Sequence, residues 1–318
     1  MLIKFKKIHF FAIGAAFASI VFFVILTTVN PASQKKQVLG QSNKKIIVEK
    51  TMINKVPQKR ADAVSPQINA KAFYLMDGNN FYPLLGKNEN DILPVASTTK
   101  MATALVVMEN YSKKLNDTVV INSQMVNVVE TRIRLLTGEK ISIKSLLEGL
   151  LINSGNDAAY SLAIYLGGLD SFVAEMNAKV KNIGLKKTEF YDPAGLDDRG
   201  HSSAKELAVL GAYVLKSKKI AEIVKIPEKT IYSVDGRYAH ELINSNRLVK
   251  PGETLYLPYA IGVKTGFTYE AGHVLVSAAE KDGHKLIAVV LNTFKDSKPA
   301  SAEESRKLLE WGFNNWTW

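Results

Sequence analysis

An apolar stretch near the N-terminus divides the chain into two very different parts. Residues 8–29 contain no Lys, Arg, Asp or Glu, and three lysines stand just before them at Lys4, Lys6 and Lys7. A helix of this length would be about 33 Å long, enough to cross the hydrocarbon core of a bilayer. We therefore expect a basic cytoplasmic tail at 1–7 and a single transmembrane anchor at 8–29. Because lysines stay on the cytoplasmic side, the rest of the chain is predicted to lie outside the cell membrane.

A cleaved signal peptide is the alternative for this segment. Such peptides usually have an apolar stretch of about 7–15 residues, followed by a cleavage site of small residues. Val29-Asn30-Pro31-Ala32 offers no good site of this kind, so we favour an uncleaved anchor. Residues 30–66 are rich in Lys, Gln, Asn and Ser, which predicts a flexible linker to a folded domain at 67–318.

The distribution of charge argues against a nucleic-acid-binding protein. The formal net charge is +11, but residues 1–66 carry +9 of it and residues 67–318 only +2. A nucleic-acid-binding domain needs a basic face on its folded part. The chain has no cysteine, which excludes disulfides and thiolate chemistry, and its five histidines lack the spacing of zinc ligands. We therefore predict no metal and no nucleic-acid partner.

Ser97 and Lys100 stand three residues apart at the expected start of a helix. The residues after them repeat at the spacing of one buried helical face: Met101, Ala104, Leu105 and Met108. Both polar side chains then leave the same side of the first turn. A hydroxyl becomes a good nucleophile when a base takes its proton, and a partly desolvated lysine can be that base. The same Ser-x-x-Lys spacing occurs at three other places in the chain, so this pair needs partners from elsewhere.

A second polar motif interrupts a helical stretch. Ser142 is expected to cap a helix that buries Leu146, Leu147, Leu150 and Leu151. Gly155 should break this helix, and Ala158 should begin the next one. Such a joint would turn Ser154 and Asn156 toward a cleft, although an ordinary helix–helix turn is the alternative.

The last third of the chain changes to the period of β-strands. Strands are predicted at 71–77 and 81–85 near the start of the domain, and at 260–265, 273–280 and 285–292 near its end; helices are predicted at 169–183, 204–215 and 299–313. The resulting fold class is α+β, with an antiparallel sheet formed from both chain ends and a helical region between. Lys264 and Thr265 place a cation and a hydroxyl beside Gly266, which permits close approach of another backbone. A strand that simply ends in a turn is the alternative here.

Three motifs in a fixed order connect these observations to a known group of enzymes. Ser97-Thr98-Thr99-Lys100, Ser154-Gly155-Asn156 and Lys264-Thr265-Gly266 form the signature set of penicillin-interacting serine enzymes. With the longer runs at 149–159, 195–198 and 307–313, residues 67–314 resemble the D-alanyl-D-alanine carboxypeptidase family. These proteins are low-molecular-weight penicillin-binding proteins and serine DD-peptidases. The resemblance implies a β-lactamase/DD-peptidase-like fold and no cofactor. It also implies an enzyme that trims peptidoglycan stem peptides ending in D-Ala-D-Ala and is acylated by β-lactam antibiotics.

The resemblance also implies a role for each motif residue. Ser97 would attack the carbonyl of the D-Ala-D-Ala bond with neutral Lys100 as base, giving an acyl-enzyme. The backbone N–H groups of Ser97 and Phe267 would form the oxyanion hole, and Ser154 with Lys264 would pass a proton to the departing D-alanine. The substrate-binding residues would be Asn156, Lys264, Thr265, Gly266 and Phe267.

Other functions stay open at this stage. Relatives often carry an arginine before the last helix that assists carboxylate binding, where this chain has Ser301, with Lys295 or Lys298 as possible substitutes. This departure keeps a DD-endopeptidase that cuts cross-links as the main alternative. A class A β-lactamase would show Ser-Asp-Asn as its middle motif and a glutamate in the following loop, but residues 192–200 have aspartates only. A catalytically inactive wall-binding module is the alternative outside the enzymes.

Overall fold

The structure is a computed structural model that describes residues 56–318. The predicted tail, the anchor at 8–29 and most of the predicted linker lie outside the described residues. Within residues 56–318, none of the helices has the length and apolar character needed to span a membrane.

The strands are β1 (Gln58–Lys59), β2 (Ala70–Asp77), β3 (Pro83–Lys87), β4 (Leu93–Pro94), β5 (Thr118–Val120), β6 (Lys140–Ser142), β7 (His201–Ser202), β8 (Glu228–Tyr232), β9 (Ala239–Ile243), β10 (Ala260–Thr268), β11 (Gly272–Lys281), β12 (His284–Thr293) and β13 (Trp316–Thr317). The helices are α1 (Lys100–Asn110), α2 (Ser123–Val126), α3 (Ile143–Ile152), α4 (Asn156–Leu166), α5 (Leu169–Asn182), α6 (Ala204–Val214), α7 (Lys218–Val224) and α8 (Ala300–Asn315), with short 3₁₀ helices η1 (Ala96–Thr99), η2 (Ser112–Lys114) and η3 (Arg247–Val249).

A five-stranded antiparallel sheet holds the two ends of the domain together. Its strand order is β10-β11-β12-β2-β3, so the late strand β12 pairs directly with the early strand β2. The sheet was predicted from both chain ends, and this prediction is confirmed. Strand β10 forms one edge of the sheet, which leaves its outer side available to the helical region.

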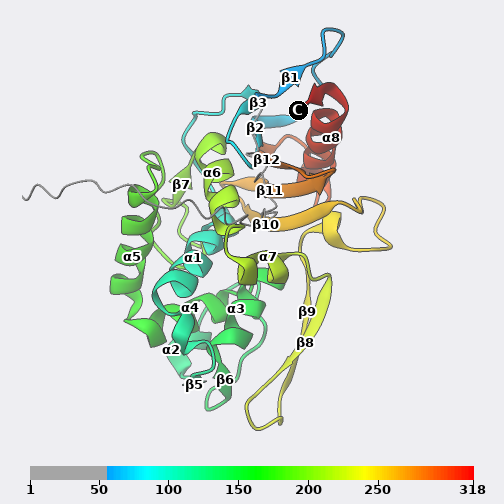
Figure 1. The fold of residues 1–318 in the computed structure, drawn as a ribbon. Helices are drawn as coiled ribbons and strands as arrows, with labels where there is room; N and C mark the ends of the chain where they lie inside the picture. The colour runs from blue at the N-terminus through cyan, green and yellow to red at the C-terminus, as the bar shows by residue number, and fades with distance from the viewer. Residues whose placement is uncertain (1–55) are drawn as a thin grey trace, which may run out of the picture. The chain divides into compact units, whose positions relative to one another are not determined.

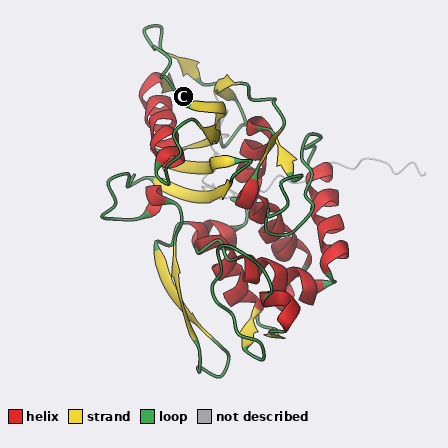
Figure 2. Ribbon diagram, turned by 180° about the vertical axis from the view of Figure 1, so that it is seen from behind, coloured by secondary structure: helices red, strands yellow, loops and turns green. Residues whose placement is uncertain are grey.

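Helices cover both faces of this sheet, which explains the nearly continuous burial of its central strands. Helix α8 lies on one face against β11 and β12, while α6 lies on the other face against β12 and β2 (Figures 1 and 2). Leu308 and Leu309 of α8 are fully buried in the first of these layers. The second layer joins the sheet to the core of the helical region.

The helical region is built around α1, α3 and α4. Every residue of α1 from Lys100 to Val107 is buried, so this helix forms the centre of the region rather than its surface. Helix α3 begins where Ser142 was expected to cap it, because the Ser142 side chain accepts a hydrogen bond from the backbone N–H of Ser145 at 3.0 Å. The predicted helices at 169–183 and 204–215 are found as α5 and α6, each within a residue of its expected bounds.

The folded part of the chain begins earlier than the predicted boundary at residue 67. Strand β1 pairs with β13 at the C-terminus, and the Arg60 backbone N–H donates to Asn315 O at 2.9 Å. The Trp311 indole also donates to Val64 O at 2.7 Å. These contacts are made mostly by backbone groups, so the polar composition of residues 56–66 gave no sign of them.

Candidate active site

Ser97 lies in the turn that delivers the chain into α1. It occupies the 3₁₀ helix η1, and Lys100 is the first residue of α1, so the two side chains leave one side of the same turn, as the spacing predicted. Lys100 Nζ lies 2.8 Å from Ser97 Oγ. Ser97 is half-buried whereas Lys100 is fully buried.

The amine of Lys100 is held by two further oxygen atoms. It donates to Asn156 Oδ1 and to the backbone oxygen of Ala194, both at 2.7 Å. Burial lowers the pKa of Lys100 from 10.5 to about 7, although the charges of Asp192, Glu130 and Asp157 oppose this shift. A substantial fraction of the amine is therefore neutral at neutral pH.

The loop at 192–198 presents the carbonyl of Ala194 to this amine. The Asp192 carboxylate shapes the loop by accepting backbone N–H groups of Ala194 at 2.6 Å and of Gly195 and Asp197 at 2.7 Å. Gly195 has a φ of 78°, and a Cβ atom there would lie 1.9 Å from Ala96 O, so the loop packs directly on the turn that carries Ser97. The backbone acceptor at Ala194 has no side-chain signal in the sequence.

Ser154 and Asn156 stand where α3 ends and α4 begins. The break between these helices is made by Ser154, which has a φ of 63°, whereas Gly155 is an extended residue before the first turn of α4. The predicted break at Gly155 is therefore wrong in detail, because α3 already ends at Ile152 and the left-handed residue is Ser154. Asn156 does face the centre of the site, because its side-chain oxygen contacts Lys100.

The next residue, Asp157, anchors the loop that crosses the start of α4. Its buried carboxylate accepts backbone N–H groups of Ile133 at 2.9 Å and Leu135 at 3.1 Å. Asn156 reaches the same loop through Val129 O and Thr131 O. Sequence reasoning missed this function of Asp157, although a carboxylate directly after Ser-Gly-Asn at a helix start was a possible signal.

Edge strand β10 brings the third motif to the same place. A Cβ atom on Gly266 would lie 2.9 Å from the backbone nitrogen of Ser97, so the glycine permits the close approach of backbones that was expected. Lys264 is 1% exposed and donates to Thr265 O at 3.0 Å. Burial lowers the pKa of Lys264 well below 10.5, and the nearby charge of Lys100 lowers it further.

The side chains that follow Lys264 are more exposed than Lys264 itself. Thr265 Oγ1 lies 2.6 Å from Ser245 Oγ, a contact partner that the sequence did not suggest. Phe267 is 40% exposed, and its ring packs on His273 with a centroid separation of 4.5 Å. The structure thus brings together Ser97, Lys100 and Asn156 through direct contacts, with Gly266 packed against Ser97 and Lys264 close enough to Lys100 to sense its charge.

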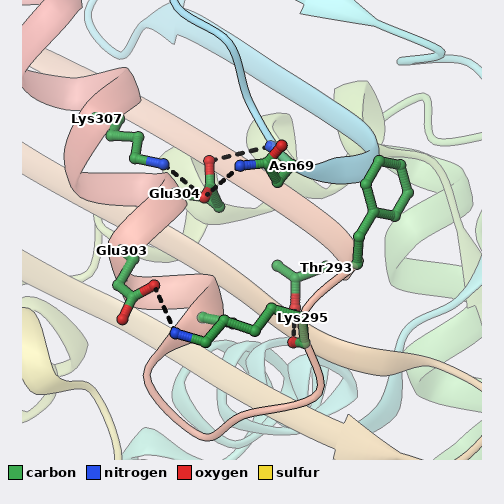
Figure 3. Close-up of a pocket in the computed structure, with 8 residues that line it drawn as sticks. Asn69, Thr293, Lys295, Glu303, Glu304 and Lys307 are labelled. Carbon is green, nitrogen blue, oxygen red and sulfur yellow. Dashed lines mark hydrogen bonds and ion pairs between the residues drawn. The ribbon is translucent and has the colours of Figure 1, made fainter.

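A hollow of about 350 Å³ lies beside the start of α8, and none of the motif residues lines it (Figure 3). Lys295 pairs there with Glu303 at 3.7 Å, and Lys307 pairs with Glu304 at 2.7 Å. Ser301 is buried in α8. Lys295, a possible substitute for the arginine missing at Ser301, therefore has a carboxylate partner in this hollow. Within residues 56–318, no group of three His, Asp or Glu side chains is arranged to hold a metal ion.

Comparison with known proteins places this geometry in one family. Residues 58–295 match the model of the family described as Peptidase_S11, D-alanyl-D-alanine carboxypeptidase. The D-alanyl-D-alanine carboxypeptidase DacF of Bacillus subtilis (strain 168) is 34% identical over 253 residues, which are 78% of this chain and 63% of that protein. A D-alanyl-D-alanine endopeptidase of Pseudomonas aeruginosa is 32% identical over 261 residues, 80% of this chain and 82% of that protein. The crystal structure of the Streptomyces K15 DD-transpeptidase matches with a TM-score of 0.73 and 30% identity, covering 79% of this chain and 100% of that one.

Proposed function

Because the chain belongs to the D-alanyl-D-alanine carboxypeptidase family of serine peptidases, we propose that it releases the terminal D-alanine from peptidoglycan stem peptides. The substrate ends in D-Ala-D-Ala, and the reaction proceeds through an acyl-enzyme on Ser97. β-Lactam antibiotics acylate the same hydroxyl. The chain spans 63% of the length of the Bacillus relative, so the activity of the whole protein is part of this proposal.

The arrangement of hydrogen bonds around Lys100 carries this proposal. A neutral amine has two N–H donors and one lone pair. Asn156 Oδ1 and Ala194 O are both acceptors, and each lies 2.7 Å from Nζ, so they take the two N–H groups. The lone pair is then left for the third contact, the Ser97 hydroxyl at 2.8 Å. Because the pKa of Lys100 is about 7, this proton-accepting form is well populated at neutral pH.

The remaining steps follow from the position of β10. Ser97 Oγ attacks the carbonyl carbon of the scissile bond while Lys100 takes its proton, and the developing oxyanion accepts the N–H groups of Ser97 and Phe267. Gly266 supports this arrangement, since it lets β10 approach the Ser97 nitrogen closely. Ser154 and Lys264 then deliver a proton to the departing D-alanine amine, and water hydrolyses the acyl-enzyme.

The proposal is tested by replacing the nucleophile. Ser97→Ala should remove both D-alanine release and the stable mass increase that labelled penicillin gives with the wild-type chain. Ser112→Ala is the matched control, because Ser112 is an exposed serine outside the site. Unchanged D-alanine release by Ser97→Ala would refute the mechanism. Rapid penicillin turnover with no persisting adduct on the wild-type chain would instead indicate a β-lactamase.

Cleavage of cross-links is the second candidate activity. It is favoured by the 32% identity to the Pseudomonas endopeptidase and by the buried position of Ser301, which offers no cation to a terminal carboxylate. Mass spectrometry of muropeptides after incubation distinguishes the two activities. Loss of one alanine from a pentapeptide indicates the carboxypeptidase, and conversion of a dimer to monomers indicates the endopeptidase.

We also propose that residues 8–29 anchor the protein in the cell membrane with its catalytic domain outside. The proposal is supported by the uncharged apolar composition of this segment and by the three lysines before it. The full-length chain should remain in the membrane fraction after washing with high salt and leave it only with detergent. Extraction by salt alone would contradict the anchor.

A further inference from the structure

The loop that crosses the start of α4 holds one residue in a fixed place beside the site. Asn156 donates from its backbone N–H to Thr131 O at 2.7 Å, and from its side-chain Nδ2 to Val129 O at 2.9 Å. Glu130 lies between these two acceptors, so its backbone is fixed on both sides by the same site residue. Its φ is 64°, a left-handed conformation that few residues other than glycine adopt.

The carboxylate of Glu130 differs from the other two that act on the site. Asp192, Glu130 and Asp157 are the three acids whose charges raise the pKa of Lys100 against the effect of burial. The carboxylates of Asp192 and Asp157 are buried and accept backbone N–H groups, Asp192 from its own loop and Asp157 from Ile133 and Leu135. Glu130 is exposed, and among residues 56–318 nothing forms a hydrogen bond or ion pair with its side chain. Its charge is close to the site and still available to a ligand.

The cations near Glu130 do not neutralise it. Arg132 and Arg134 follow it in the same loop, and both are exposed, yet neither forms an ion pair with it. Lys100 and Lys264 are buried and use their amines inside the site. Within residues 56–318 no cation pairs with Glu130, so a cation on a bound molecule can do so.

We propose that Glu130 is a specificity-determining residue that pairs with a primary ammonium group on the substrate. This group belongs to the side chain of the residue immediately before the D-Ala-D-Ala pair. The assignment rests on the proposed function and on the family resemblance, which makes Asn156 a substrate-binding residue. Asn156 binds the backbone on both sides of Glu130, so the glutamate lies beside a residue that would contact the peptide.

Two synthetic tripeptides and one isosteric substitution test this pairing. The substrates are Nα-acetyl-Lys-D-Ala-D-Ala with its ε-amine either free or acetylated, and the quantity measured is the ratio of their kcat/KM values. In Glu130→Gln the preference for the free amine should fall roughly threefold to tenfold relative to the wild-type chain, as for a partly exposed ion pair. The wild-type preference should also fall at high ionic strength, because salt screens an exposed pair.

Glu241→Gln provides the matched control, since Glu241 is an exposed glutamate on β9 outside the site. It removes the same charge and should leave the ratio unchanged. An unchanged ratio in Glu130→Gln would overturn the inference, and so would an equal loss with both substrates, which would assign Glu130 to the chemical step. D-Alanine release from the acetylated peptide by the wild-type chain reports on the proposed function separately. A chain that releases D-alanine but shows no change of ratio therefore refutes only the role of Glu130.

Discussion

Lys100 Nζ and Asn156 Oδ1 lie 2.7 Å apart, although the two residues are separated by 56 positions in the chain. This contact joins the turn that carries Ser97 to the joint between α3 and α4. It also fixes which N–H of the amine points away from Ser97. The reactivity of Ser97 is thus expected to depend on both the protonation of Lys100 and the charge of its neighbour at position 156.

The first prediction concerns the pH dependence of acylation. Burial lowers the pKa of Lys100 to about 7, and only the neutral amine can accept the proton of Ser97. The rate of acylation by labelled penicillin should therefore rise with pH from about 6 to about 8, with a midpoint near the pKa of Lys100. The profile is obtained by quenching the reaction at set times and measuring the acyl-enzyme by mass spectrometry.

Asn156→Asp tests whether the midpoint belongs to Lys100. A carboxylate at this position places a negative charge beside the amine and favours its protonated form. The midpoint should therefore move to higher pH by about 1 unit or more. A profile that is flat between about pH 6 and 8, or a midpoint that stays in place in Asn156→Asp, would show that Lys100 is not the titrating base.

The second prediction concerns the close packing of the 192–198 loop on the Ser97 turn. Gly195→Ala combines an unfavourable φ of 78° with a Cβ atom 1.9 Å from Ala96 O, so loop and turn must separate. We expect a loss of about 2–4 kcal/mol in the free energy of unfolding and a large loss of penicillin acylation. Urea unfolding and the acylation rate measure the two effects.

Gly236→Ala is the control for this substitution. Gly236 has a similar φ of 72°, but a Cβ atom there would meet nothing within 4 Å. It should cost only about 1 kcal/mol and leave acylation unchanged. If the two variants lose the same stability and activity, backbone conformation alone explains the effect and the packing on Ala96 does not matter.

The third prediction concerns Asp157 as the anchor of the loop at 129–135. Asp157→Asn keeps the shape of the side chain but replaces one acceptor oxygen by a donor, which then faces a backbone N–H of Ile133 or Leu135. Leaving such buried groups unpaired should cost about 1–3 kcal/mol. Because Asn156 binds the same loop, kcat/KM for D-alanine release should fall as well.

Asp91→Asn is the comparison variant, since Asp91 is exposed and its side chain accepts no hydrogen bond within residues 56–318. It should change stability by less than about 0.5 kcal/mol. Equal stability of Asp157→Asn and the wild-type chain in urea would exclude an anchoring role.

Periodic patterns in the sequence predicted most of the elements, because burial sets their period. The strands β10, β11 and β12 and the helix α8 lie at or near their expected bounds, and β2 pairs with β12 as a sheet formed from both ends requires. The hairpin of β8 and β9 was missed. Its strands are short and mostly exposed, so they lack a long apolar pattern.

The candidate site was predictable where the types of the residues themselves decide the contacts. The pair of Ser97 and Lys100 follows from spacing, and the approach of Gly266 follows from the absence of a side chain. The acceptor at Ala194 is a backbone oxygen supplied by tertiary structure, and any residue type could provide it. The left-handed conformation of Ser154 was likewise invisible, because sequence reasoning assigns such positions to glycine first.

The fourth prediction concerns the pH dependence of stability. It depends on a buried pair, His240 and Glu139, that contacts the loop at 129–135. His240 Nε2 lies 2.7 Å from Glu139 Oε1, and its Nδ1 lies 2.9 Å from Ile133 O. Both neighbours are acceptors, so the protonated ring satisfies them together, and the hydrogen bond to Glu139 is the largest cause of the raised pKa of His240.

A histidine whose folded pKa is raised binds its proton more tightly in the folded state than in the unfolded chain, where the pKa is about 6.5. Its stabilising contribution is therefore complete below about pH 6.5 and is lost as the pH rises through the folded pKa. The free energy of unfolding of the wild-type chain should exceed that of His240→Gln most at about pH 6, and the difference should shrink toward about pH 8.5. The difference is measured by urea unfolding at several pH values. Glu139→Gln removes the carboxylate partner of His240. The difference in free energy of unfolding between Glu139→Gln and the double variant Glu139→Gln/His240→Gln should therefore no longer depend on pH. A difference that grows with pH would mean that His240 is held neutral in the folded protein.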